Sequence, residues 1–148
     1  MMVIHVVVAF RPGHPRSAPV TPVQRAEGKR NGGGRHRRGP DPSDRSGTRG
    51  GPIVVKHRIS PFVGTELETL LRANGIDTLV LAGVHTTGVV LSTVRHAGDL
   101  DYRLVVVRDC CADPDAEVHA MLLDRVIAKQ AAVVTTAELA GALPGRSS

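Results

Sequence analysis

Short runs of Val, Ile and Leu alternate along most of this chain with segments of helical periodicity, a pattern typical of βαβ units around a parallel sheet. The runs are almost continuously apolar, which indicates strands covered on both faces by helices. A chain of 148 residues has the length of one domain. The sequence therefore predicts an α/β fold with three layers, α/β/α. The predicted strands are Val3–Phe10, Ile53–His57, Thr78–Ala82, Leu104–Arg108 and Ala132–Thr135.

The first two helices are predicted in the connections on either side of the central strand. In residues 64–74, Thr65 and Glu68 have the T-x-x-E spacing of a capping box. In residues 87–98, apolar side chains recur at i, i+4 and i+7, which places them on one face of a helix. Both segments therefore predict amphipathic helices.

Two further helices are predicted from their capping residues. Asp113 has the side chain of an N-cap, and Pro114 would then occupy the first helical position, where its missing N–H costs nothing. Thr135 and Glu138 form a second T-x-x-E pair. We therefore expect helices to begin after Asp113 and after Thr135.

The positive charge of the chain is concentrated in residues 21–52. This segment holds eight Lys and Arg against three acidic residues, whereas the rest of the chain holds 11 of each. It also holds eight of the 16 glycines and few apolar residues, so it cannot bury enough surface to offset its ordering entropy. We expect an irregular segment here, and an Arg/Gly/Pro-rich block of this kind is also what a compensated frame shift in GC-rich DNA would produce.

The composition divides the chain into four parts. Residues 1–20 hold an early strand and a turn-rich loop, 21–52 the basic segment, 53–143 the main domain and 144–148 a tail. The basic segment allows nucleic-acid binding as an alternative function, but it lacks the interleaved aromatic residues of a stacking surface. Binding of that kind would weaken steeply with salt and disappear on deletion of residues 21–52.

Candidate site residues follow the predicted strands, because ligands of open parallel sheets bind beyond the carboxyl ends of the strands. Lys56 ends one strand and can stabilise negative charge or donate a proton, or it is a solvated charge. Gly83 and His85 follow the next strand at a strand–turn–helix junction, here called the elbow. Backbone N–H groups at the start of its helix would suit an anion or an oxyanion. A turn histidine that satisfies the backbone is the other interpretation of His85.

Cysteine and histidine give little sign of other chemistry. Cys110 and Cys111 are adjacent and follow Asp109, whose charge disfavours a thiolate, so we interpret them as structural thiols. Four other histidines have no partner at metal-ligand spacing, except that Glu117 stands near His119, so we predict no metal site and no cofactor. These histidines are His5, His14, His96 and His119.

Four motifs in order resemble the isochorismatase-like (cysteine hydrolase) family. They are the strand-end Lys of IVVKHR, the F-x-G-T-x-L-E segment that starts at Phe62, the G-V-x-T-x-x-V-V-x-S-T-x-R-x-A elbow and the D-C-C-A-D segment that starts at Asp109. The resemblance runs from about residue 53 to 143, and VIHVVVAFRPGHP resembles an earlier strand and loop. It implies a Rossmann-like parallel sheet flanked by helices.

The resemblance also implies roles for individual residues. The family's catalytic Lys corresponds to Lys56, a pocket-lining aromatic to Phe62, and the oxyanion N–H groups to those of His85 and Val89. An unusual cis peptide is implied at Val84–His85. Members with an elbow Cys hydrolyse amides, whereas Val89 stands at that position here, so a thioester route is not available. Members without the Cys cleave a vinyl ether with water, using an Asp as the acid.

The chain differs from the family pattern in its N-terminal part. Family domains begin with a central strand that ends in the catalytic Asp, but no acidic residue precedes Glu27. We therefore expect an N-terminally truncated domain whose first strand is missing, with unpaired backbone at that place in the sheet.

These observations predict a Cys-less, impaired hydrolase of a small molecule that cleaves a non-peptide C–N or ether bond. The alternative within the same fold is a non-catalytic oligomeric or interaction module, and we expect a homo-oligomer. The opening apolar run is shorter than the roughly 18 residues of a membrane span, so we expect a cytoplasmic protein without a membrane partner.

Overall fold

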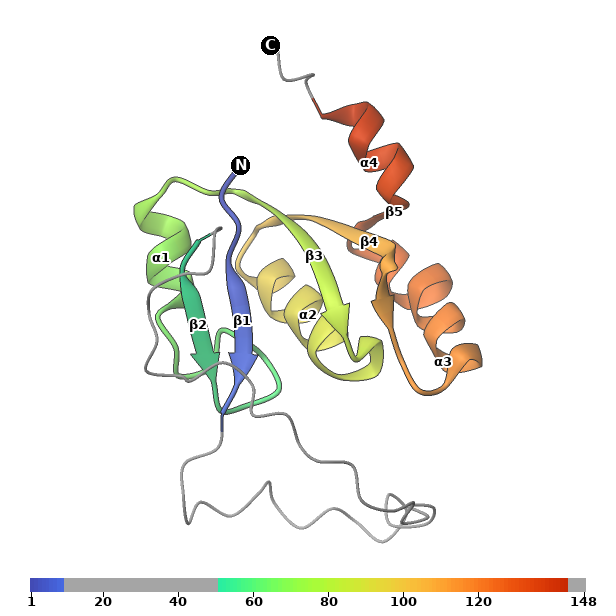
Figure 1. Cartoon of the computed structure of the whole chain (residues 1–148), viewed down its shortest axis with the longest axis horizontal. Coiled ribbons are helices and arrows are strands. Elements are labelled where there is room, and N and C mark those ends of the chain that lie inside the picture. Colours follow the sequence, from blue (N-terminus) through green and yellow to red (C-terminus); the bar gives the residue numbers. More distant parts are fainter. Residues whose placement is uncertain (10–50, 144–148) are drawn as a thin grey trace, which may run out of the picture. The chain divides into compact units, whose positions relative to one another are not determined.

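A computed structural model describes residues 1–9 and 51–143 (Figure 1). The predicted loop with His14, residues 21–50 of the basic segment and the tail 144–148 lie outside the described residues.

All five predicted strands are present in the described parts of the chain. The strands are β1 (His5–Val8), β2 (Ile53–Lys56), β3 (Thr78–Val84), β4 (Arg103–Ala112) and β5 (Ala132–Val134). The α-helices are α1 (Leu67–Ala73), α2 (Leu91–Asp99), α3 (Ala116–Met121) and α4 (Thr136–Ala142). A π-helical turn, Thr86–Val90, leads into α2, while α3 continues as a π turn, Leu122–Val126, and a 3₁₀ turn, Ile127–Lys129. Strands therefore alternate with helices, which confirms the α/β class.

The chain divides into two compact units, residues 1–55 and 56–148. In the first unit, β1 pairs with β2, and the His5 N–H donates to the Pro52 carbonyl at 3.0 Å. In the second unit, three parallel strands follow the order β3–β4–β5. The described strands thus form two sheets, where the sequence predicted one sheet that lacks a strand.

The pairing of β3 with β4 contains a register shift. Leu81 is opposite Val106, but Gly83, two residues later, is opposite Cys111. The strand β4 therefore accommodates additional residues between these two pairs, as a β-bulge does. As a result β4 extends to Ala112, and the sequence prediction that it ends at Arg108 is wrong.

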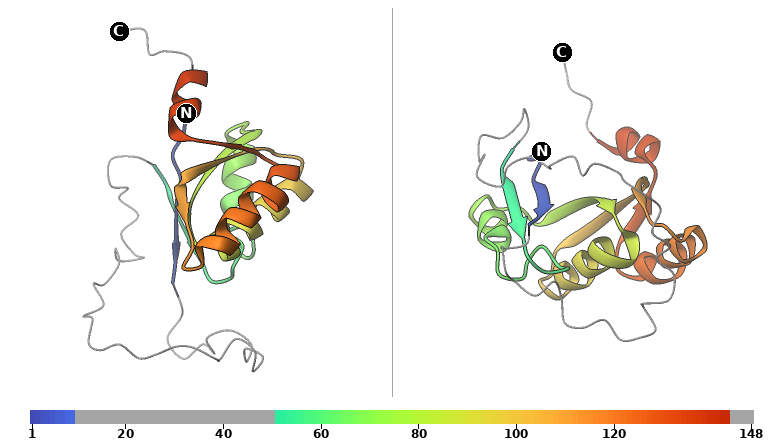
Figure 2. Two further views of the ribbon diagram at one scale, coloured as in Figure 1. Left: turned by 90° about the vertical axis from the view of Figure 1, so that its right-hand side faces the viewer. Right: turned by 60° about the horizontal axis from the view of Figure 1, so that its bottom comes forward.

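The core of the second unit lies between the three-stranded sheet and the helices α2 and α3. These two helices lie on the same face of that sheet (Figure 2). Tyr102 and Leu104 are buried together with apolar residues of α1, of α2 with the turn that leads into it, of β4 and of the helical turns that follow α3. Those residues are Leu67, Leu71, Val90, Val94, Ala97, Val106, Val107, Leu122, Leu123 and Ile127.

The capping box predicted at Thr65 and Glu68 is not the one that starts α1. The helix begins at Leu67, with Glu66 as its N-cap residue. The Thr65 hydroxyl accepts from the Leu67 N–H at 3.2 Å and donates to the Pro61 carbonyl. Glu68 instead lies 3.8 Å from Arg72, one turn along the helix. Thr65 therefore links Pro61 in the preceding loop to the first residue of the helix.

The prediction that Asp113 caps the third helix is also wrong, because Asp115 does so. The Asp115 carboxylate accepts from the N–H groups of Glu117 and Val118 at 3.1 and 3.0 Å. The last predicted box is confirmed: Thr135 accepts from the Glu138 N–H, and the Glu138 carboxylate accepts from the Thr135 N–H at 2.7 Å.

No helix within residues 1–9 and 51–143 is long and apolar enough to cross a membrane.

Leu123→Ala tests this core. Leu123 is 1% exposed, so the substitution removes buried methyl groups and leaves a cavity. We expect a loss of about 2–5 kcal/mol in the free energy of unfolding, measured by denaturant titration. Met121→Ala is the control, because Met121 is 44% exposed two residues earlier, and its effect should stay within about 0.5 kcal/mol. Equal effects of the two substitutions would contradict the packing described.

Candidate functional site

Lys56 is the last residue of β2 and begins the second compact unit. Its ammonium group donates to the carbonyl of Arg58 at 2.9 Å, which folds the side chain back over the segment that follows. Partial burial lowers the pKa of Lys56 below its usual value, because the charged form loses hydration. Lys56 is therefore a partly desolvated cation held by the backbone of its own loop.

The elbow begins where β3 ends. The peptide bond Val84–His85 is cis, as the family resemblance implied. His85 is exposed, and its carbonyl accepts from the N–H groups of Gly88 and Val90 at 3.1 and 3.3 Å. The π turn Thr86–Val90 thus starts from His85, and Val89 lies inside this turn.

Thr86 fixes the elbow from the inside. Its side chain is fully buried, and its hydroxyl lies 2.8 Å from Nδ1 of His119 on α3 and 3.3 Å from the carbonyl of Ala112. A hydroxyl has one proton and can accept as well, so one Thr86 side chain satisfies both partners. The elbow is thereby joined to the end of β4 and to the helix beyond it.

Asp113 fixes the elbow from the exposed side. Its carboxylate accepts from the Thr87 N–H at 2.8 Å and from the Thr87 hydroxyl at 2.6 Å. These bonds from Thr87 lower the pKa of Asp113. The sequence predicted that N–H groups at this helix start are open to a ligand. For Thr87 this is wrong, because a protein carboxylate occupies that position.

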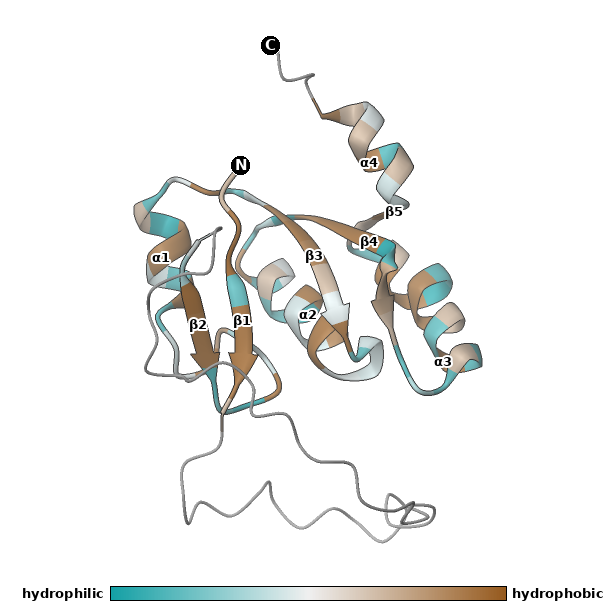
Figure 3. Cartoon of the chain, viewed as in Figure 1, coloured by the Kyte–Doolittle hydropathy of each residue, from teal (hydrophilic) through white to brown (hydrophobic). Residues whose placement is uncertain are grey.

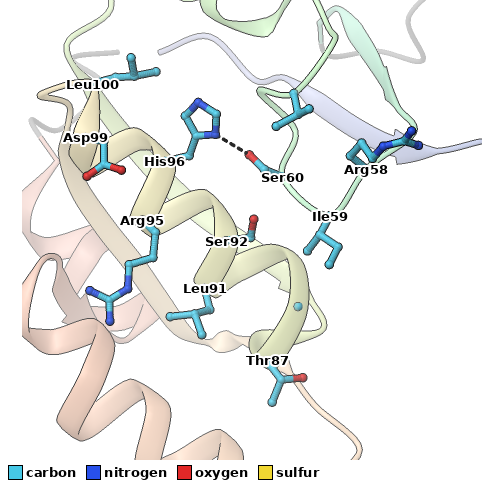
Figure 4. A pocket seen from close by; sticks show the side chains of 12 residues that line it. Arg58, Ile59, Ser60, Thr87, Leu91, Ser92, Arg95, His96, Asp99 and Leu100 are labelled. Carbon is cyan, nitrogen blue, oxygen red and sulfur yellow. Dashed lines mark hydrogen bonds between the residues drawn. The ribbon is translucent and has the colours of Figure 1, made fainter. Parts of the chain in front are cut away.

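A groove of about 790 Å³ runs between the segment after Lys56 and the elbow helix (Figure 4). Arg58, Ile59, Ser60 and Val63 line it from the first segment. The opposite wall belongs to the elbow and α2, and consists of Thr87, Gly88, Leu91, Ser92, Arg95, His96, Asp99 and Leu100. The groove therefore combines an aliphatic surface with hydroxyl, imidazole, guanidinium and carboxylate groups.

A hydrogen bond between Ser60 and His96 closes one part of the groove wall. The Ser60 hydroxyl lies 3.2 Å from Nδ1 of His96 and also accepts from the Phe62 N–H at 3.3 Å (Figure 4). The Phe62 ring stacks on the imidazole with a centroid distance of 5.0 Å and lies 6.2 Å from the ring of Tyr102. Phe62 is 7% exposed, so it supports His96 from the core.

None of the four residues predicted for the site lines this groove, but each is close in the sequence to a lining residue or in contact with one. Lys56 precedes the lining residue Arg58, and His85 and Val89 stand on either side of the lining pair Thr87 and Gly88. Phe62 stacks under His96, which does line the groove. The structure therefore brings together the two segments that carry the predicted residues.

Asp109 and the two cysteines lie inside β4 and not beyond its end. The Asp109 carboxylate accepts from the Thr136 N–H at 2.9 Å and so holds the first residue of α4. Cys111 is opposite Gly83 in the sheet, and burial raises the pKa of its thiol, which favours the protonated form. Cys110 is exposed. Within residues 1–9 and 51–143, no three side chains of His, Cys, Asp or Glu gather as metal ligands would.

The sequence did not reveal the partners of His96, His119 and Asp113. Ser60 and Thr86 are 36 and 33 residues away from their histidines, so no local spacing connects them. The sequence predicted Asp113 as an N-cap residue, but its carboxylate accepts hydrogen bonds from Thr87, which is 26 residues away.

Comparisons with known proteins agree with this geometry. The family model of the isochorismatase domain matches residues 1–138. An uncharacterized isochorismatase family protein, YecD of Escherichia coli O157:H7, is 38% identical over 90 residues, which are 61% of this chain and 48% of that protein. Maleamate amidohydrolase of Pseudomonas putida is 36% identical over 83 residues, 56% of this chain and 39% of that enzyme. This chain thus matches less than half the length of these relatives.

A solved structure of an isochorismatase family protein from Burkholderia thailandensis has the same fold. It superposes with a TM-score of 0.71 at 26% identity, over 93% of this chain and 71% of that one.

Asp113→Asn tests the anchoring of the elbow. Since the folded state lowers the pKa of Asp113, its charge stabilises the fold above about pH 4, and this contribution is lost as the pH falls through the folded-state pKa. We expect the Tm at pH 7 to fall by about 3–6 °C, and the difference from wild type to shrink below about pH 4. Asp99→Asn, which removes the same charge from the exposed last residue of α2, should shift the Tm by less than about 2 °C. A pH-independent difference would contradict the role of the Asp113 charge.

Proposed function

The chain belongs to the isochorismatase family, and from that premise we propose that it hydrolyses a small molecule at a non-peptide C–N or ether bond without a covalent intermediate. The observation that carries this proposal is the position of Lys56 at the head of the segment that forms one wall of the groove, with the elbow on the other. A cation with reduced hydration stabilises negative charge that develops on a substrate oxygen.

The residue at the elbow decides between the two routes of hydrolysis. Val89 has no nucleophilic atom, so water must attack the substrate directly. The water route needs an acid, which in the family resemblance is the Asp that ends the first strand. Residues 1–148 contain no counterpart of it, because no acidic residue precedes Glu27. Because general acid catalysis contributes roughly 10²- to 10⁴-fold, we propose that residues 1–148 alone turn over slowly.

The substrate class follows from the groove and the relatives. Arg58 and Arg95 place two guanidinium groups at the groove against one carboxylate, that of Asp99, and this excess of positive charge suits a small substrate with a carboxylate. The name of maleamate amidohydrolase describes such a substrate for that relative. Maleamate, an N-carbamoyl amino acid and a vinyl ether of pyruvate are therefore the compounds to assay, by release of ammonia or pyruvate.

Lys56→Met tests the role of Lys56. We expect kcat/KM for the best of these compounds to fall by about 10²-fold, because the removed cation acts in the transition state. Lys129→Met is the matched control, since Lys129 is an exposed lysine on the 3₁₀ turn, and it should keep the wild-type kcat/KM. If the two variants have equal activity, Lys56 has no catalytic role.

Alkylation with iodoacetamide tests the proposed route. The reagent should label the exposed Cys110 and leave turnover unchanged, because the water route uses no thiol. Mass spectrometry follows the labelling and the same assay follows the rate. Loss of activity in step with labelling would contradict a Cys-less mechanism.

A further inference from the structure

The start of the elbow turn is polar, yet it is anchored in the interior of the second unit. Figure 3 shows this turn in much paler colours than the strand β3 that leads into it, because Thr86, Thr87 and Gly88 are not strongly apolar. The Thr86 side chain is nevertheless fully buried, and its backbone carbonyl accepts from the N–H of Leu91, the first residue of α2. The contacts of Thr86 therefore help to fix the position of the turn.

The Thr86 hydroxyl has two neighbours and one hydrogen. The carbonyl of Ala112, 3.3 Å away, can only accept, so it needs that hydrogen. Nδ1 of His119 lies 2.8 Å from the same hydroxyl oxygen. Both contacts are hydrogen bonds only if Nδ1 carries a hydrogen of its own and donates it to Thr86. Full use of the two contacts therefore requires the Nδ1–H form of the imidazole.

His119 approaches Thr86 from a helix start that is itself fixed. The Asp115 carboxylate caps α3, and the Asp115 carbonyl accepts from the His119 N–H at 2.9 Å. Asp113, two residues earlier, holds Thr87 through its carboxylate. Two consecutive elbow residues are thus held by the short stretch that joins β4 to α3 and by the first turn of that helix.

We propose that His119 is a positioning residue for the reaction: its Nδ1–H donates to Thr86 and so keeps the elbow backbone where it can orient a substrate. The role in catalysis rests on the proposed function, in which the elbow forms one wall of the groove. Thr87 and Gly88 line that wall directly after Thr86, whereas His119 is not one of the lining residues. His119 therefore acts through Thr86, and a displacement of about 1 Å at such a surface costs on the order of 10²-fold in rate.

His119→Leu and His119→Asn test the need for a donor in turnover. Leu has no donor, whereas the Asn amide can place an N–H near the position of Nδ1. With the best substrate, we expect kcat to fall at least about tenfold in His119→Leu and to stay within about threefold of wild type in His119→Asn. Circular dichroism establishes that each variant is folded at the assay temperature. A folded His119→Leu variant with wild-type kcat, or equal losses in the two variants, would overturn the proposal.

Leu71→Ala is the control for loss of stability. Leu71 is 2% exposed on α1, so the substitution destabilises the fold at a site outside the elbow. The folded variant should keep the wild-type kcat, which separates loss of stability from loss of positioning. A fall in kcat as large as that of His119→Leu would assign the effect of His119 to stability and contradict a positioning role.

Thr86→Val tests whether His119 acts through Thr86. Val has the shape of Thr without the hydroxyl, so this variant should lose about as much kcat as His119→Leu. In the double variant the two losses should not add, and its kcat should lie within about twofold of that of the slower single variant. Additive losses would mean that His119 acts by another route, against the proposal.

Two measurements without substrate separate the role of His119 from the proposed function. Nitrogen-15 NMR should identify the neutral imidazole as the Nδ1–H form, and a hydrogen on Nε2 would overturn the proposal. Amide hydrogen exchange at Gly88 and Val90, whose N–H groups donate to the His85 carbonyl, should be at least about tenfold faster in His119→Leu than in His119→Asn. If the wild type turns over none of the compounds, the proposed function fails, while these two results still decide whether His119 holds the elbow.

Discussion

The pairing of β3 with β4 is the constraint on which the candidate site depends. Val84, at the end of β3, is opposite Ala112, because the register shift advances β4 relative to β3. Asp113 therefore follows at the level of the elbow, where its carboxylate reaches Thr87. Without the shift, Asp109 would be opposite Val84, and Cys110 would follow at this level in place of Asp113. The register shift between β3 and β4 thus places the Asp113 carboxylate within hydrogen-bonding distance of the elbow.

The elbow is held by polar contacts from two directions and not by its own helix alone. Buried Thr86 bonds to His119 and Ala112, and exposed Thr87 bonds to Asp113. A buried hydroxyl must be satisfied, so displacing the elbow would cost both of the Thr86 interactions at once. The groove wall formed by Thr87 and Gly88 is accordingly a fixed surface, as precise substrate placement requires.

Features that depend on neighbouring residues could be predicted from the sequence. Thr135 and Glu138 are three residues apart, so their capping box follows from spacing and is present. The five strands were found for a similar reason, because each is a short apolar run. Thr65 and Glu68 have the same spacing as the correct box, but Thr65 lies near Pro61 and Glu68 near Arg72. Spacing alone does not decide which of several partners a side chain takes.

Features that depend on distant residues could not be predicted. The sequence predicted that Asp109 and the two cysteines follow the end of the strand, yet Cys111 and Ala112 pair with β3, and Asp109 holds the first residue of α4. Tertiary partners for polar side chains made this strand longer than its composition indicated.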